Sequence, residues 1–171
     1  EALAAQIPGI EFISGVRNVS ATVVYQAQNW STGVVGVQNG YFSARKLVLA
    51  SGRAFNEAEE RDGRPVCVVG ETVRRELFGA ANPVGSRLRA KTFACDVIGL
   101  LKASGQASMG ADQDDVVIMP LRTVQRRLTG DQEVGSIVIS VRDQAATDQV
   151  KAAVTRLLRE RRRIARNEDD N

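Results

Sequence analysis

Apolar residues recur at two different spacings along the chain, which predicts a mixture of strands and helices. Short apolar or alternating runs predict strands at 19–28, 32–38, 66–69, 93–101, 116–119 and 135–141. Apolar residues three or four positions apart predict helices at 1–7, 71–78, 121–128 and 150–163, with a single helical turn at 41–45. The connections are short, so we expect α/β packing (a mixed α+β class), with helices on one face of a sheet.

The central stretch, residues 65–101, gives the clearest succession of elements. Val66–Val69 is a short β-branched run between a proline and a glycine, which suits a buried strand. A helix over Glu71–Phe78 follows, and Gly79 can adopt the left-handed conformation that ends a helix. Pro83 then breaks the chain before the strand Phe93–Leu101. We therefore expect strand, short helix, turn and strands in this order.

The last helix has the most regular amphipathic pattern. Val150, Val154, Leu157 and Leu158 recur at i, i+4, i+7 and i+8, which places them on one face. We expect Val154 and Leu157 to be core residues. The segment after Arg163, residues 164–171, reads as a polar tail.

Composition narrows the possible functions. The chain has 171 residues, 43% of them hydrophobic and 25% charged, which is ordinary for one globular domain or two small ones. No apolar run approaches the roughly 18 residues of a membrane span, and no signal-peptide pattern opens the sequence. Histidine is absent, which removes the commonest general base and metal ligand. A phosphate-binding G-x-x-x-x-G-K-[ST] loop is also absent. We expect no enzyme activity, no cofactor and no metal.

The two cysteines, Cys67 and Cys95, fall in strands that we expect to be neighbours. Zinc would require further ligands, and no histidine is available. Two alternatives remain, a disulfide bond and a pair of buried thiols. We favour the thiols, because strand cysteines often serve as small core residues.

An acidic segment, GADQDD, places Asp112, Asp114 and Asp115 in a glycine-containing loop. Alternating carboxylates in such a loop can bind calcium, but the bidentate glutamate of the twelve-residue calcium motif is missing. We interpret the three residues as a structural loop, whose carboxylates accept backbone hydrogen bonds and shape the turn into the next strand.

Basic residues gather on helix faces and near the C-terminus, although 23 Lys and Arg against 20 Asp and Glu leave a net charge of only +3. The helix-face set is Arg74, Arg75, Arg122, Arg126 and Arg127, which we interpret as solvated faces rather than an anion site. The C-terminal set is Arg159, Arg161, Arg162, Arg163 and Arg166. Glu160 and Glu168 interleave with this second set, so we expect no nucleic-acid partner.

Several motifs, in one order, resemble the extracytoplasmic core domain of MacB-type ABC transporter permeases. The central motif is PVCVVGETVRRELFG at 65–79, followed by NPVG at 82–85 and DVIGLL at 96–101. YFSARKLVLASGRAF lies upstream at 41–55, while GADQDDVVIMPLRTVQRRLTG at 110–130 and LLRERRR at 157–163 lie downstream. Their order and spacing together are specific, and they cover most of the chain.

The resemblance implies a division that periodicity alone does not predict. A membrane-proximal, porter-like βαβ subdomain would combine residues 1–30 and 133–163, and a distal mixed α/β subdomain, residues 31–132, would be inserted between them. Helix 1–7 and the last helix would then lie side by side. Membrane helices outside this chain would anchor the domain on the periplasmic side of the inner membrane.

The resemblance also implies a non-catalytic function in export or efflux. Such domains relay ATP-driven conformational change across the membrane. Their partners would be an ATPase subunit, reached through the membrane helices, and a second permease copy. In MacB-like systems they also contact a periplasmic adaptor protein and an outer-membrane channel. The alternative function is a stand-alone extracytoplasmic ligand-binding or protein-interaction module.

Overall fold

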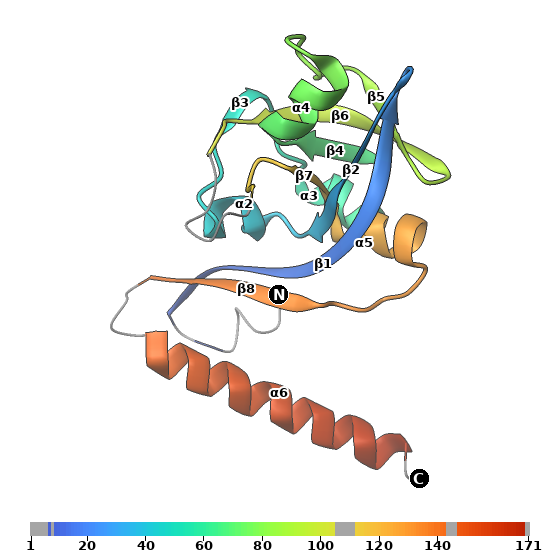
Figure 1. Cartoon of the computed structure of the whole chain (residues 1–171). Coiled ribbons are helices and arrows are strands. Elements are labelled where there is room, and N and C mark those ends of the chain that lie inside the picture. Colours follow the sequence, from blue (N-terminus) through green and yellow to red (C-terminus); the bar gives the residue numbers. More distant parts are fainter. Residues whose placement is uncertain (1–6, 8, 105–111, 143–146, 170–171) are drawn as a thin grey trace. The chain divides into compact units, whose positions relative to one another are not determined.

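Most predicted elements are present in the structure, a computed structural model that describes residues 7, 9–104, 112–142 and 147–169. Strands and helices are mixed along the chain, which confirms the mixed α+β class (Figure 1). In order, they are β1 (Ile10–Tyr25), β2 (Gln28–Val37), α2 (Gly40–Ala44), β3 (Leu49–Gly52), α3 (Glu57–Asp62), β4 (Val66–Val69), α4 (Glu71–Phe78), β5 (Arg87–Ala90), β6 (Phe93–Leu101), β7 (Val116–Pro120), α5 (Leu121–Val124), the π-helix η1 (Gln125–Thr129), β8 (Ser136–Val141) and α6 (Thr147–Asp169).

The chain divides into two units. The larger comprises residues 14–138, and the smaller combines residues 1–13 with 139–171. Within the larger unit, six strands pair in a closed ring, in the order β1, β2, β7, β4, β6, β5 and back to β1. β3 pairs with β6 outside this ring. The ring closes because β1 pairs with β2 and its residues Val23 and Val24 also pair with β5, a closure that the sequence did not predict.

Alternation along the strands divides the apolar residues of the larger unit between two cores. Adjacent residues of a strand point to opposite faces. Val34 and Val69 belong to the first core, with Val73 of α4 and Val124 of α5. Their strand neighbours belong to the second core, which includes Val35, Val68, Phe55, Leu101 and Ile118. The continuous apolar run of β4 arises because both of its faces are buried.

The turn between the first two strands differs from the prediction. The strands predicted at 19–28 and 32–38 leave residues 29–31 for the turn between them, but Tyr25 pairs with Gln28, so the hairpin turns at 26–27. Gln26 adopts a left-handed conformation there, with φ +52°. Neither position carries the Asn or Gly that usually marks a two-residue hairpin, so the local signal was absent. Trp30 consequently lies within β2, opposite Val23, and is partly buried against the first core.

Helix α3 is short and depends on its caps. Asn56 and Glu59 form a capping box, in which the Asn56 side chain accepts from the Glu59 N–H and the Glu59 carboxylate accepts from the Asn56 N–H. Arg53 donates to both Glu59 carboxylate oxygens, at 2.6 and 3.2 Å. The Arg53 side chain is the main cause that lowers the pKa of Glu59 from its ordinary value of 4.5. The Glu59 carboxylate therefore connects the first turn of α3 to Arg53 in the segment before the helix.

Replacing Arg53 by glutamine should lower the free energy of unfolding by up to about 1 kcal/mol at pH 7, since Arg53 remains half-exposed. Because the native pKa of Glu59 is depressed, this contribution is present above the unfolded pKa near 4.5 and is lost as the pH falls through the native pKa. Urea unfolding of both proteins at pH 7 and at pH 3 measures the difference.

The matched control is Arg87→Gln, which removes a pair with Asp96 at 3.1 Å. Both partners of this pair are more than half exposed, so we expect almost no change in stability. A difference between wild type and Arg53→Gln that stays constant down to pH 3 would contradict the assignment to Glu59.

In the smaller unit, α6 packs on a third core in which Ile7, Ile10 and Val150 are buried. Ile7 thus shares a core with the last helix, as predicted. Leu3 and residues 1–6 of the helix predicted at 1–7 lie outside the described residues. Val154 and Leu157 pack against this core, as predicted, but they are partly buried and lie at its edge rather than inside it. Val150, one turn earlier, is the residue of that face that is buried.

Helix α6 continues to Asp169, past the end predicted at Arg163. Arg159, Arg161 and Arg162 are exposed on it. Across the described part of the chain, no helix combines the length and apolar character that crossing a bilayer requires.

Candidate functional site

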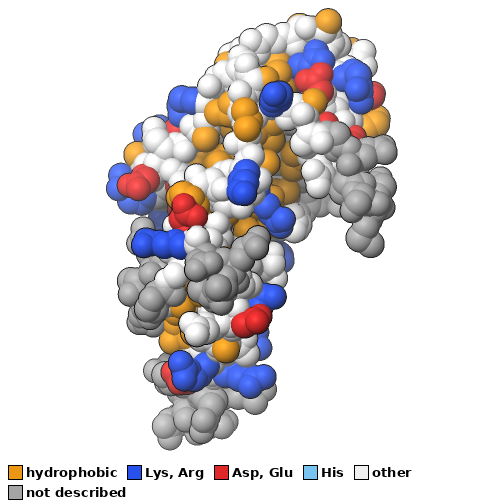
Figure 2. All heavy atoms as spheres, turned by 90° about the vertical axis from the view of Figure 1, so that its left-hand side faces the viewer, with side chains coloured by type: hydrophobic (Ala, Val, Ile, Leu, Met, Phe, Trp, Pro, Cys, Tyr) orange, Lys and Arg blue, Asp and Glu red, His pale blue; other side chains and the backbone are white. Residues whose placement is uncertain are grey.

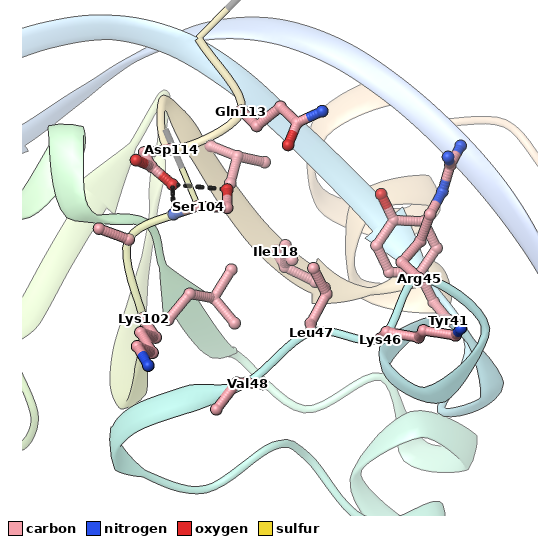
Figure 3. Close-up of a pocket in the computed structure, with 13 residues that line it drawn as sticks. Tyr41, Arg45, Lys46, Leu47, Val48, Lys102, Ser104, Gln113, Asp114 and Ile118 are labelled. Carbon is pink, nitrogen blue, oxygen red and sulfur yellow. Dashed lines mark hydrogen bonds between the residues drawn. The ribbon is translucent and has the colours of Figure 1, made fainter. Parts of the chain in front are cut away.

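A pocket of about 600 Å³ opens in the larger unit, beside α2. Its walls come from α2 and the segment after it, from the end of β6 and from β7 (Figure 3). The apolar part of the lining consists of the Tyr41 ring and Leu47, Val48, Leu101, Val116 and Ile118. Ile118 and Leu101 are buried in the second core, whereas Val48 is 59% exposed. The pocket therefore exposes a hydrophobic surface that joins the core to solvent.

Charged and polar side chains surround this apolar surface. In the part of the lining that the structure describes, Arg45, Lys46 and Lys102 are cationic and Asp114 is the carboxylate. Asp114 Oδ1 accepts from the Ser104 N–H at 2.8 Å and from the Ser104 hydroxyl at 2.9 Å (Figure 3). The Arg45 guanidinium carbon lies 5.9 Å from the centre of the Tyr41 ring, within the range of a cation–π contact. The lining is thus predominantly cationic.

The end of α2 shapes the mouth of the pocket. The Leu47 N–H donates to the Phe42 carbonyl at 2.9 Å, and the Lys46 N–H donates to the Ser43 carbonyl at 3.1 Å. These two bonds form a Schellman motif, which places Lys46 in the left-handed position, with φ +53°. Glycine usually occupies that position, because a Cβ is disfavoured there. The motif turns the chain so that Leu47 and Val48 line the pocket.

The three aspartates predicted as a structural loop have protein partners. Asp115 Oδ1 accepts from Trp30 Nε1 at 2.9 Å and from the Thr32 hydroxyl at 2.6 Å. Asp112 accepts from the Thr72 hydroxyl at 2.6 Å and from the Asp114 N–H at 2.9 Å, and the Thr72 bond is the main cause that lowers the pKa of Asp112. Within residues 112–115 and the rest of the described chain, no cluster of three or more candidate ligands could hold a metal ion. The structural role stays a prediction, and these bonds are the reason to keep it.

Three of the helix-face arginines bind neighbouring protein groups. Arg74 forms an ion pair with Glu71, three residues earlier on α4, and is the main cause that lowers the pKa of Glu71. Arg122 and Arg126 donate to the carbonyls of Arg61 and Asp62 at the end of α3, at 2.6 and 3.2 Å. These two arginines therefore connect the α5–η1 segment to the C-terminus of α3, where cations are favoured.

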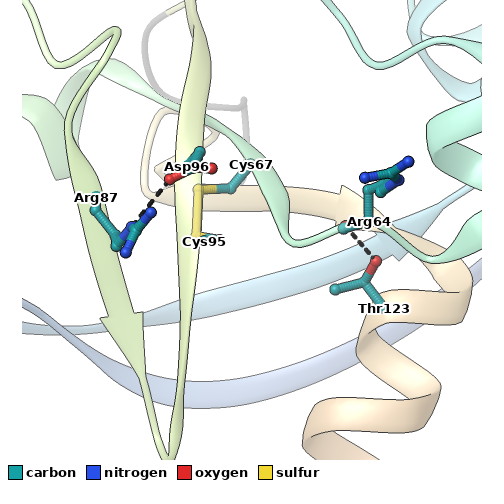
Figure 4. The surroundings of a disulfide bond; sticks show 6 residues. All are labelled: Arg64, Cys67, Arg87, Cys95, Asp96 and Thr123. Carbon is teal, nitrogen blue, oxygen red and sulfur yellow. Dashed lines mark hydrogen bonds and ion pairs between the residues drawn. A yellow bond between two sulfur atoms is a disulfide. The ribbon is translucent and has the colours of Figure 1, made fainter.

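A disulfide bond joins Cys67 of β4 to Cys95 of β6, with their Cα atoms 5.9 Å apart (Figure 4). The two strands are neighbours, as the sequence predicted. The favoured alternative, two separate thiols, is not what the structure contains. Both cysteines are at most 1% exposed and belong to the first core. Because the sequence has only these two cysteines, neither sulfur is left as a nucleophile or ligand.

Apart from Asp114, which was named for the acidic loop, the charged residues of the pocket were not identified from the sequence. The predicted helical turn at 41–45 is present as α2, but Arg45 and Lys46 carried no recognisable motif. One signal was available in the sequence. Lys46 follows the helical turn predicted at 41–45, at the position where glycine commonly ends a helix. Lys102 and Asp114 reach the same pocket from segments far along the chain, and only the pairing of β6 and β7 with β4 brings them together.

The closed ring of strands, the disulfide and the surface pocket describe an α+β domain, and its disulfide is of the kind that persists in oxidising compartments. The family model for the MacB-like periplasmic core domain matches residues 1–157, and the chain belongs to this family. It is accordingly the MacB-like periplasmic domain of an ABC transporter permease, on the extracytoplasmic side, and the recognition from sequence motifs is confirmed.

Named relatives are macrolide export ATP-binding/permease proteins MacB. The chain is 36% identical over 156 residues to that of Chlorobium phaeobacteroides, covering 91% of this chain and 24% of the relative. It is also 36% identical over 159 residues to that of Bdellovibrio bacteriovorus, covering 93% of this chain and 24% of the relative. The chain therefore spans about a quarter of the length of these relatives.

Two solved structures share the fold. The periplasmic region of MacB from Actinobacillus actinomycetemcomitans superposes with a TM-score of 0.80 at 22% identity, covering 93% of this chain and 71% of that one. The extracellular domain of the noncanonic ABC-type transporter YknZ from Gram-positive bacteria gives 0.74 at 18% identity, covering 87% and 74%. At these identities the likeness concerns the fold alone.

Proposed function

We propose that this domain is a non-catalytic relay, which moves when an ATPase on the other side of the membrane binds and hydrolyses ATP. The movement would pass through membrane helices that flank the domain in the longer protein. Two copies of the permease would bring two such domains together and apart. Export or efflux would follow from this movement, through contacts with a periplasmic adaptor protein and an outer-membrane channel.

The observation that carries the proposal is the family match over residues 1–157, together with relatives named as ATP-binding/permease proteins. The proposed division into a membrane-proximal part, residues 1–30 with 133–163, and a distal part, residues 31–132, agrees with a relay. A third core joins segments from both chain ends, Ile7 and Ile10 with Val150 of α6. Forces applied at the two ends would therefore reach the same packed unit.

The test measures the distance between two copies of the domain in the full-length transporter. Spin labels on Glu76→Cys suit it, because Glu76 is exposed on α4 while both native cysteines are buried in a disulfide. We expect the distance distribution between copies to differ between the nucleotide-free transporter and the transporter trapped with ATP. Identical distributions in every nucleotide state would overturn the relay.

A second label pair within one copy provides the matched control. Glu76→Cys combined with Arg89→Cys of β5 places both labels in residues 14–138, at exposed positions. Their separation should stay constant in all nucleotide states, because both belong to one packed unit. A change in this internal distance would mean that the unit itself deforms, which a rigid relay does not allow.

A further inference from the structure

We propose that the pocket beside α2 binds a monomeric amphiphile with an apolar body and an anionic head, such as a single-chain carboxylate or phosphate. The inference is independent of the relay, since it concerns the pocket of one domain. Three observations carry it: the apolar walls, the sign of the charges in the lining and the left-handed conformation of the lining residue Lys46.

The shape and lining of the pocket suit a small apolar body. A volume of about 600 Å³ falls within the range of roughly 300–1,000 Å³ that is usual for small-molecule sites. Val48 is 59% exposed, the most exposed of the large hydrophobic residues identified in the structure. Figure 2 shows hydrophobic side chains open to solvent on this side of the molecule, with Lys and Arg side chains beside them. A ligand that covered Val48 and Leu47 would remove apolar surface from water.

The charges select the head group. Among the described lining residues, three are cationic, Arg45, Lys46 and Lys102, and one is a carboxylate, Asp114. The Asp114 carboxylate accepts two hydrogen bonds from Ser104, so part of its acceptor capacity is already used. An anionic head would be attracted by the excess of cations, whereas a quaternary ammonium head would be repelled. The charge balance therefore distinguishes an anion from a cation of equal chain length.

Lys46 is the residue that points to selection for binding. Its left-handed conformation, φ +53°, is the one at which glycine carries no penalty. Strained positions of this kind cluster at ligand sites, where the side chain has a role that offsets its cost. Lys46 would then be present for its cationic side chain, which belongs to the pocket lining, rather than for the turn. A lipid surface offers the same head-group chemistry, but a cavity with walls on several elements suits a free molecule better.

The test uses the 171-residue chain and calorimetric titration with decanoate below its micelle concentration. Decanoate should bind, and decyltrimethylammonium at equal concentration should not. Lys46→Gly should weaken decanoate binding roughly two- to fivefold, the value of one exposed ion pair, while its Tm stays equal or rises. Lys46→Asn should weaken decanoate binding by the same factor, because asparagine also tolerates the left-handed conformation. This second variant shows whether the weakening by Lys46→Gly comes from the lost charge or from the added flexibility of glycine. Val48→Glu should abolish decanoate binding.

Lys91→Gly is the matched control, because Lys91 also has φ +53° and lies in the turn between β5 and β6, outside the pocket lining. It removes the same charge and should leave decanoate affinity unchanged. Three outcomes would overturn the proposal: no binding, equal binding of both head groups, or equal weakening by Lys46→Gly and Lys91→Gly. Binding to phosphatidylglycerol vesicles without binding to monomeric decanoate would assign the surface to a membrane and would also overturn it.

Discussion

Replacing Cys67 and Cys95 together by alanine should lower the free energy of unfolding by about 3–4 kcal/mol. The bond joins residues separated by 28 positions, so it removes much of the conformational freedom of the unfolded chain. Both side chains also lie in the first core, at 0% and 1% exposure, so the small cavities left by the sulfur atoms add to the loss. Urea unfolding at pH 7, followed by circular dichroism, measures the difference.

Reduction of the wild-type protein provides the internal control for this prediction. A reducing agent should destabilise the wild type by a similar amount and should leave the double alanine variant unchanged. Two free thiols titrated in the denatured, unreduced wild type would contradict the bond itself. A loss below about 1 kcal/mol in the variant would mean that the bond contributes little to stability.

The disulfide agrees with the extracytoplasmic position of the domain family. Disulfides persist in oxidising compartments and are rare in the reducing cytosol. Cys67 and Cys95 sit on neighbouring strands in the first core, where reductants have little access. The sequence placed the two cysteines on adjacent strands, but the choice between bond and thiols depended on the distance between their Cα atoms. Spacing along the chain contains no information on that distance.

Elements that depend on local signals were predicted accurately. β4, α4 and β6 begin and end where the sequence predicted. Pro65, Gly70 and Gly79 mark the ends of β4 and α4, and the apolar pattern of β6 is regular. α2 and α6 were also predicted, although the end of α6 was placed too early. Secondary-structure propensity and the spacing of apolar residues are properties of a few neighbouring residues, so a short stretch of sequence is enough to predict these elements.

Features that depend on distant contacts were not predictable in the same way. The hairpin turn at 26–27 lacks a turn residue, and closure of the ring depends on β1 pairing with β5 more than 60 positions away. Of the candidate site, Asp114 was singled out from sequence, but for the acidic loop and not for a pocket. The pocket consists of segments joined only by strand pairing, and no local pattern encodes that arrangement.

Gly70 illustrates how a local signal can hide a distant cause, and Gly70→Ala should lower the free energy of unfolding by at least about 2 kcal/mol. The sequence marks Gly70 only as the end of a strand. In the structure, its N–H donates to the Val116 carbonyl at 2.9 Å, and a Cβ added there would lie far inside van der Waals contact with the backbone carbonyl oxygen of Asp114. Backbone cannot rotate away as a flexible side chain can.

Relief of this clash would separate the 112–115 turn from the start of α4. The Asp114 carbonyl accepts from the Thr72 N–H at 3.2 Å, and Asp112 accepts from the Thr72 hydroxyl, so both bonds would weaken together. Trp30 would report the movement, because its indole N–H donates to Asp115 in the same turn. We therefore expect Gly70→Ala to change the Trp30 emission of the native protein as well as its stability.

Gly33→Ala is the matched control for Gly70→Ala, since it makes the same change in β2, where an added Cβ meets no atom within 4 Å. Alanine should be neutral there or stabilising by up to about 1 kcal/mol, because glycine in a strand is unfavourable. Urea unfolding and tryptophan emission of the three proteins, wild type and both variants, decide the matter. A loss of less than about 0.5 kcal/mol in the free energy of unfolding of Gly70→Ala would contradict the prediction. It would mean that the 112–115 turn moves away at little cost, so that the close approach of Asp114 to Gly70 does not fix the junction between β4 and α4.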